Sequence, residues 1–187
     1  MLHQADSILE DLEDFLLSDL VFWPRPEPRS GGGSRYDLSL GLALLARDSL
    51  RAYEQASSEV DARRLRSAAE AITDVMERWA AATSRKARAE LPQRLNLWQG
   101  YLEEARDTPS SAKEYPLQVR NRVIAERLAP LADPAVSTGQ GQRLRLLDQS
   151  LNGMFLSGPF VWEEALSPAY PQAAFWFLYG GIRLTPD

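Results

Sequence analysis

Apolar residues recur every three or four positions along most of the chain, which is the spacing typical of amphipathic helices. The first such stretch, residues 7–23, begins with Ser7 and Glu10 in a capping-box pattern. Its apolar side carries Ile8, Leu12, Phe15, Leu16 and Leu20. Its other side carries Asp6, Glu10, Asp11, Glu13, Asp14 and Asp19. We expect a helix that buries the first side and presents the acidic side to water or to an arginine-rich neighbour.

Two longer helices are predicted to follow. Residues 37–56 have one stripe that we expect to be buried, with Asp37 as the candidate N-cap, and its members are Leu38, Leu42, Leu45, Ser49 and Tyr53. The next helix begins after Ser58 and carries Val60, Leu65, Ala68, Ala69, Ile72, Val75, Met76 and Trp79 at helical spacing. Pro92 removes a backbone donor further on, so the sequence allows either two consecutive helices or one kinked helix there.

The rest of the chain also has mainly helical patterns. Ser111 and Glu114 form a second capping box before a helix through Leu117, Ile124 and Leu128. Another helix places Leu144, Leu147, Leu151, Met154 and Phe155 on one face. Short helices are expected at 159–166 and 171–180, although a strand is the alternative for 171–180; helix is favoured because no second strand is evident nearby. The fold class expected is all-α, a single-domain bundle of about six or seven helices.

Residues 24–35, PRPEPRSGGGSR, have no periodicity. Alternating prolines favour an extended chain and the glycines make it flexible, so we predict a long flexible loop. Its arginines, Arg25 among them, leave two interpretations: a solvated linker, which we favour, or contact with an acidic partner or phosphate.

The segment 154–181 contains eight of the 17 aromatic residues. Its longest uncharged run is about half of the ~20 residues that a membrane-spanning helix needs, so no membrane span is expected. We expect the segment to pack on the bundle and to close its apolar end. Any part of it that stays uncovered, around Trp162, Glu163 and Tyr170 and next to Trp23, is the candidate site.

Composition excludes several kinds of chemistry. The net charge of −5 lacks the basic excess of a nucleic-acid binder, although the cations are arginine-rich. The chain is cysteine-free, which removes thiolate nucleophiles and Cys-bound metals. The one histidine is His3, so histidine-based catalysis and histidine metal sites lack their central residue. We therefore expect no metal or cofactor. The acidic N-terminus does not resemble a signal peptide, and a cytoplasmic protein is expected.

Two functions fit this sequence. The favoured one is a non-catalytic interaction or regulatory protein that binds a protein partner or itself as a homo-oligomer, with no catalytic residue assigned. The alternative is a small-molecule-binding protein or an enzyme. Its pocket would be walled by Trp162, Tyr170, Trp176 and Tyr179 and covered by the loop with Trp23 and Arg25. Glu163, flanked by aromatic residues, would be its candidate acid if burial raised the pKa of its carboxyl.

Overall fold

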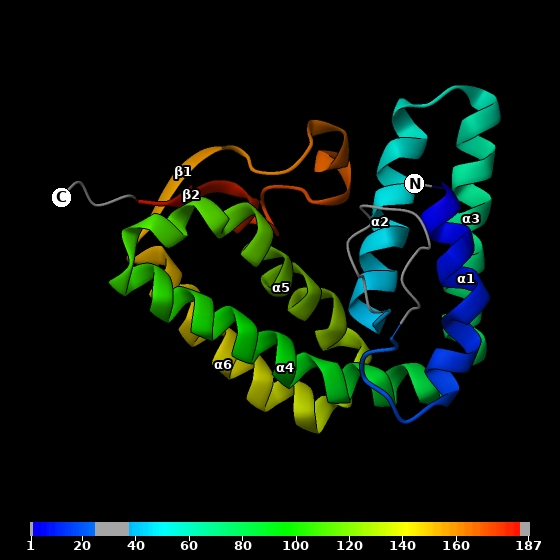
Figure 1. The fold of residues 1–187 in the computed structure, drawn as a ribbon, viewed down its shortest axis with the longest axis horizontal. Coiled ribbons are helices and arrows are strands. Elements are labelled where there is room, and N and C mark those ends of the chain that lie inside the picture. The colour runs from blue at the N-terminus through cyan, green and yellow to red at the C-terminus, as the bar shows by residue number, and fades with distance from the viewer. Residues whose placement is uncertain (1, 25–37, 184–187) are drawn as a thin grey trace.

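The structure is a computed structural model that describes residues 2–24 and 38–183, without the side chains of residues 109 and 135–137 (Figure 1). Its α-helices are α1 (Leu2–Leu17), α2 (Leu40–Ala56), α3 (Glu59–Arg78), α4 (Ala80–Asp107), α5 (Tyr115–Leu128) and α6 (Pro134–Asn152). Short 3-10 helices are η1 (Pro109–Glu114), η2 (Ala129–Leu131), η3 (Glu164–Ala169) and η4 (Trp176–Leu178). Two strands, β1 (Phe155–Phe160) and β2 (Tyr179–Ile182), pair with each other.

The predicted all-α class is confirmed. The loop predicted at 24–35 lies outside the described residues apart from Pro24.

The helices form two neighbouring groups (Figure 1). Helices α1, α2 and α3 lie side by side at one end, and α4 runs from them towards the end that carries the β-sheet, with α5 and α6 packed along it. Trp79, with φ −107 and ψ 41, separates α3 from α4. Pro92 lies inside the single helix α4, so the alternative of two consecutive helices is wrong.

Buried apolar residues from every α-helix and from the C-terminal segment form the hydrophobic core. Its largest fully buried side chains include Trp98, Tyr115, Tyr170, Phe15 and Phe177. Helix α2 is central, because it contacts α1, α3, α4, α5 and η3. The position of α2 therefore determines how the two groups of helices meet.

The predicted stripes are confirmed for most positions in α1 and α3, but three apolar residues were wrongly expected to be buried. Leu20 lies beyond the end of α1 and is 48% exposed, Val60 is 58% exposed and Leu117 is 62% exposed. Helix α1 also begins at Leu2, five residues before the predicted Ser7. Val60 and Leu117 both lie in the first turn of their helices.

The helices predicted at 159–166 and 171–180 are wrong over much of their length. β1 pairs antiparallel with β2, with Phe155 opposite Ile182 and Phe160 opposite Tyr179, and the register shifts between Ser157 and Phe160. Gly180 has φ +149, and a Cβ there would collide with the carbonyl of Leu156. Glycine therefore lets β2 lie against β1, and the two strands satisfy each other's backbone groups.

A buried carboxylate fixes the start of α2. Glu90 of α4 is 1% exposed and accepts hydrogen bonds from Ser39 Oγ at 2.8 Å, Gly41 N at 3.0 Å and Arg94 Nε at 2.8 Å. Ser39, and not the predicted Asp37, is the N-cap, and its Oγ accepts from the backbone N of Leu42. A negative charge at this end of α2 complements the helix dipole.

Lys86 of α4 holds the chain that leaves α1. Its ammonium donates to Ser18 O at 2.9 Å and to Ser18 Oγ at 3.0 Å, and also to the carbonyl of Leu20. Burial lowers the pKa of Lys86. A cation at this place satisfies carbonyl groups that the end of a helix leaves without partners.

Candidate binding groove

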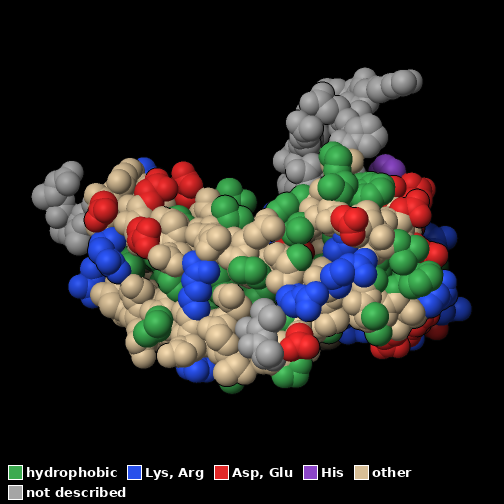
Figure 2. Space-filling view, turned by 90° about the horizontal axis from the view of Figure 1, so that it is seen from below, with side chains coloured by type: hydrophobic (Ala, Val, Ile, Leu, Met, Phe, Trp, Pro, Cys, Tyr) green, Lys and Arg blue, Asp and Glu red, His purple; other side chains and the backbone are tan. Residues whose placement is uncertain are grey.

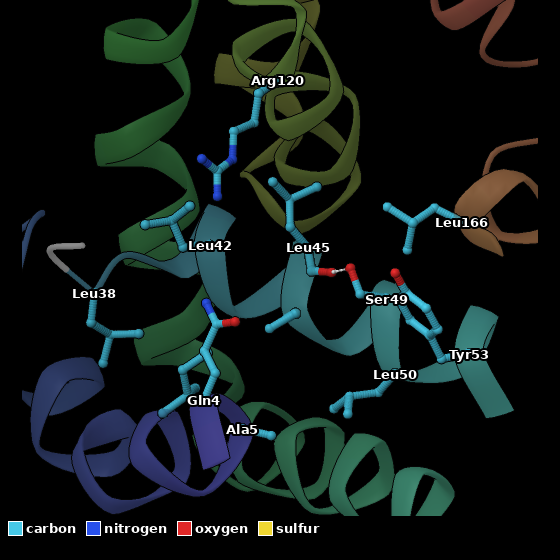
Figure 3. Close-up of a pocket in the computed structure, with 12 residues that line it drawn as sticks. Gln4, Ala5, Leu38, Leu42, Leu45, Ser49, Leu50, Tyr53, Arg120 and Leu166 are labelled. Atoms are coloured by element: carbon cyan, nitrogen blue, oxygen red, sulfur yellow. Dashed lines mark hydrogen bonds between the residues drawn. The ribbon is translucent and has the colours of Figure 1, made fainter. Parts of the chain in front are cut away.

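One side of α2 faces a cavity of about 330 Å³ (Figure 3). α1 forms one wall through Gln4, Ala5 and Ile8, and α2 forms the floor. On the other side, Arg120 extends from α5 over Leu42 and Leu45, and Leu166 of η3 faces Ser49 and Tyr53 (Figure 3). The complete lining is Gln4, Ala5, Ile8, Leu38, Leu42, Leu45, Ala46, Ser49, Leu50, Tyr53, Arg120 and Leu166.

The floor of this cavity is the stripe that the sequence pattern picked out in α2. All five predicted positions line it, namely Leu38, Leu42, Leu45, Ser49 and Tyr53. Leu42, Ser49 and Tyr53 are only partly buried, whereas Leu38 and Leu45 also belong to the buried core, with Leu40, Ala43 and Leu44. Helix α2 therefore has one apolar side in the core and a partly buried side towards the cavity.

A second cavity, of about 230 Å³, continues from the first towards the C-terminal segment. Its lining is Leu45, Ser49, Pro116, Leu117, Arg120, Trp162, Leu166 and Tyr170. Leu45, Ser49, Arg120 and Leu166 line both cavities. We call the two together the α2 groove.

The C-terminal wall of the groove is held by specific contacts. Trp162 Nε1 donates to the carbonyl of Pro116 at 2.7 Å, and its ring stands edge-on to Tyr170 with 5.2 Å between centroids. Arg127 donates to the carbonyl of Ala169 at 3.0 Å and lies over the Phe175 ring at 4.7 Å. Burial raises the pKa of the Tyr170 hydroxyl. This wall is anchored to α5 rather than loosely placed.

Tyr53 and Glu163 join α2 to the C-terminal segment beside the groove. The Tyr53 hydroxyl donates to the Glu163 carboxylate, and this hydrogen bond raises the pKa of Tyr53 to about 12. Glu163 itself is exposed. The burial on which the acid hypothesis for Glu163 depended is therefore lacking, and the residue serves as a hydrogen-bond acceptor.

The other candidate residues do not all line one pocket, as the sequence analysis had predicted. Trp23 pairs with Leu38 through two backbone hydrogen bonds of 2.7 and 2.9 Å, which places Leu38 at the groove. Trp176 packs edge-on to Phe155, and Tyr179 donates to the carbonyl of Tyr170 at 3.0 Å. The structure thus brings Trp162 and Tyr170 together in the groove, while Trp176 and Tyr179 are not among its lining residues. Arg25 lies outside the described residues.

Sequence reasoning missed Arg120 and Leu166. A signal existed for Arg120, because it lies three positions after Leu117 and four before Ile124, within the apolar stripe of the predicted helix. A charged residue inside such a stripe indicates either a buried ion pair or a polar element of a site. For Leu166 no local pattern was informative, since η3 is positioned by contacts with α2, which is distant in sequence.

Among the described residues that line the groove, Arg120 is the one with a charged side chain. Elsewhere, on the face shown in Figure 2, lysine and arginine are interspersed with aspartate and glutamate, and neither sign covers a continuous surface.

Among residues 2–24 and 38–183 there is no cluster of three metal-ligating side chains. Nor does any helix in this part of the chain have the length and apolar character needed to cross a membrane. Comparisons with protein-family models, curated proteins and solved structures gave no significant match.

Proposed function

We propose that this protein is a non-catalytic interaction protein that binds an apolar segment of a partner protein in the α2 groove. The observation that carries the proposal is that one side of α2, on which Leu42, Ala46 and Tyr53 are only partly buried, faces a cavity between α1, α5 and η3. Apolar side chains that line an open groove favour an apolar occupant, because binding removes their surface from water.

The shape of the groove suits a segment of polypeptide. From Leu42 to Tyr53 its floor follows α2 for about three turns, or roughly 16 Å at the rise of an α-helix. At one end the rim is apolar and open, since Leu117 is 62% exposed and Pro116 is exposed beside it. Peptide segments that lie in such grooves place apolar side chains into them and leave their other side in water.

A small-molecule ligand is the second candidate. The first cavity, at about 330 Å³, is within the range typical of ligand pockets, and it combines apolar walls with a few polar groups, among them Arg120, Ser49 and the Tyr53 hydroxyl. A small ligand would be mostly enclosed, so the exposed Leu117 at the rim would add little to its binding. That difference favours the protein partner.

The substitution Ala46→Trp tests the proposal, because it fills the groove from its floor. Ala81→Trp is the matched control, since Ala81 is exposed on α4 and does not line the groove. We expect a protein captured by the wild type and by Ala81→Trp to be lost with Ala46→Trp, and calorimetry with that purified protein to show the same loss. Circular dichroism must show unchanged helix content.

Retention of the same purified partner by Ala46→Trp with unchanged affinity would contradict the proposal. Native mass spectrometry of the purified protein separates the two candidates. A bound compound of small mass that is present in the wild type and absent from Ala46→Trp would support the small-molecule function instead.

A further inference from the structure

We infer that the α2 groove binds its partner segment in an extended conformation, and that the carboxamide of Gln4 pairs with one main-chain N–H and one C=O of that segment. The inference rests on the proposed function of the α2 groove and adds the conformation of the occupant and the residue that recognises it. It depends on which polar groups the groove has left for an occupant.

Gln4 brings a polar group into a cavity whose lining is mainly apolar. The residue belongs to the first turn of α1, and its carboxamide extends from α1 towards the floor formed by α2 (Figure 3). Gln4 is exposed. Within residues 2–24 and 38–183, no group forms a hydrogen bond with this carboxamide. Its oxygen and its NH₂ group are therefore available to an occupant.

The other polar side chains of the larger cavity already have partners within the protein. Ser49 Oγ donates to a backbone carbonyl of α2 at 2.9 Å, and the Tyr53 hydroxyl donates to Glu163. Arg120 also has an interaction within the protein. Among the described residues that line this cavity, Gln4 is thus the polar one that is left for recognition of an occupant.

A carboxamide is complementary to the main chain of an extended segment. It offers one carbonyl oxygen that accepts and one NH₂ group that donates. In an extended chain, the N–H and C=O of one residue point to the same side, so the carboxamide can pair with both. In a helix these groups are already bonded to each other along the helix, and its sides offer none of them. Gln4 therefore favours an extended occupant over a helical one.

The cost of covering Gln4 makes this preference effective. An apolar segment that enters the groove removes water from the carboxamide, and a buried amide without a partner is unfavourable. An extended segment replaces the lost water contacts with its own main chain. About five residues of an extended chain cover the roughly 16 Å floor, with alternate side chains turned towards α2.

Synthetic peptides test the inference directly. Two labelled eight-residue peptides have the same composition of leucine and threonine; one alternates the two residues, and the other spaces leucine for a helix. A further series of the alternating peptide replaces one internal amide at a time with an ester, which removes the N–H donor. Binding is measured by fluorescence anisotropy on the full-length wild type and on Gln4→Met. The control is Gln55→Met, because Gln55 is exposed on α2 and does not line the groove.

On the wild type and on Gln55→Met, we expect the alternating peptide to bind about tenfold tighter than the helix-spaced peptide, and one ester position to weaken binding about tenfold. On Gln4→Met, the peptide with that ester should bind as tightly as its parent, because the donor and its acceptor form one pair. Methionine is a good helix former, so circular dichroism should show unchanged helix content.

The inference is overturned if each ester has the same effect on the wild type and on Gln4→Met, or if the helix-spaced peptide binds more tightly than the alternating one. Abolition of that binding by Ala46→Trp would still leave the proposed function standing. If no peptide binds in an Ala46→Trp-sensitive manner, the proposed function fails together with the inference.

Discussion

Replacing Glu90 with alanine removes a carboxylate that is 1% exposed and that three groups bind. Ser39 Oγ, Gly41 N and Arg94 Nε donate to it at 2.8, 3.0 and 2.8 Å. Without Glu90, the N–H of Gly41 loses its acceptor at the start of α2, and Arg94, itself 9% exposed, remains as a buried cation. The perturbation therefore acts on the contact between α2 and α4.

Breaking a buried ion pair by removing one partner costs about 3–5 kcal/mol of the free energy of unfolding. Arg94 would keep hydrogen bonds to Asn121 Oδ1 at 3.1 Å and to Ser39 Oγ at 3.0 Å, so we expect a loss in the lower half of that range. At about 2–4 °C per kcal/mol for a chain of this size, the melting temperature should fall by roughly 6–16 °C. Glu90→Gln keeps an acceptor oxygen and should lose clearly less.

Urea denaturation followed by circular dichroism measures these differences. Glu59→Ala is the control, because Glu59 pairs with Arg63 at 3.6 Å with both side chains highly exposed, and its loss should cost less than about 0.5 kcal/mol. In a double-mutant cycle, Glu90→Ala and Arg94→Ala should together cost less than the sum of the two. A loss below about 1 kcal/mol for Glu90→Ala, or full additivity with Arg94→Ala, would refute the reasoning.

Three further predictions concern other parts of the fold. Gly180→Ala should cost about 1–3 kcal/mol because the φ of +149 disfavours any side chain, whereas Gly181→Ala, which has open space, should cost much less; equal melting temperatures would contradict this. Burial raises the pKa of Tyr115 and Tyr170, so above pH 10 the unfolded chain releases protons that the folded chain keeps, and stability should fall as pH rises. Urea unfolding at pH 9 and pH 11 checks the sign, and equal or greater stability at pH 11 would count against it. Lys86→Met should cost about 1–3 kcal/mol and speed amide exchange in the last turn of α1, because it leaves carbonyl groups without their donor; unchanged exchange would argue against that role.

The sequence predicted the helices well where a single amphipathic period determines them. In α1, Ile8, Leu12 and Phe15 are buried as expected, because a helix with one apolar side can bury only that side. Helix ends were less accurate. Asp37 and Ser39 are both suitable N-caps by residue type, and the choice of Ser39 depends on Glu90, which is distant in sequence.

The C-terminal segment was the main error because strand pairing is not local. The residues FLSGPF contain Gly158 and Pro159, which are typical of a break, and nothing in that stretch indicates that Phe155 pairs with Ile182. The register shift between Ser157 and Phe160 lets the Gly-Pro pair lie within β1. A pattern of neighbouring residues carries no information about such a partner.

The candidate site was predicted in part. Trp162 and Tyr170 do lie together, and the α2 stripe was recognised, but its periodicity does not reveal whether it meets a neighbouring helix or a cavity. That distinction depends on the positions of α1, α5 and η3 around it. Arg120 lies within the apolar stripe of its helix, and this interruption was the available signal for it. Glu90 has Lys86 and Arg94 four positions before and after it, so no apolar pattern marked it.

The hydrogen bond between Tyr53 and Glu163 joins residues 110 positions apart. The wall that completes the groove is therefore synthesised after α2. Contacts of such long separation form late in folding, because closing the intervening loop is costly. During synthesis, the groove side of α2 stays without its C-terminal wall, and a general chaperone that recognises exposed apolar surface would meet it in that interval.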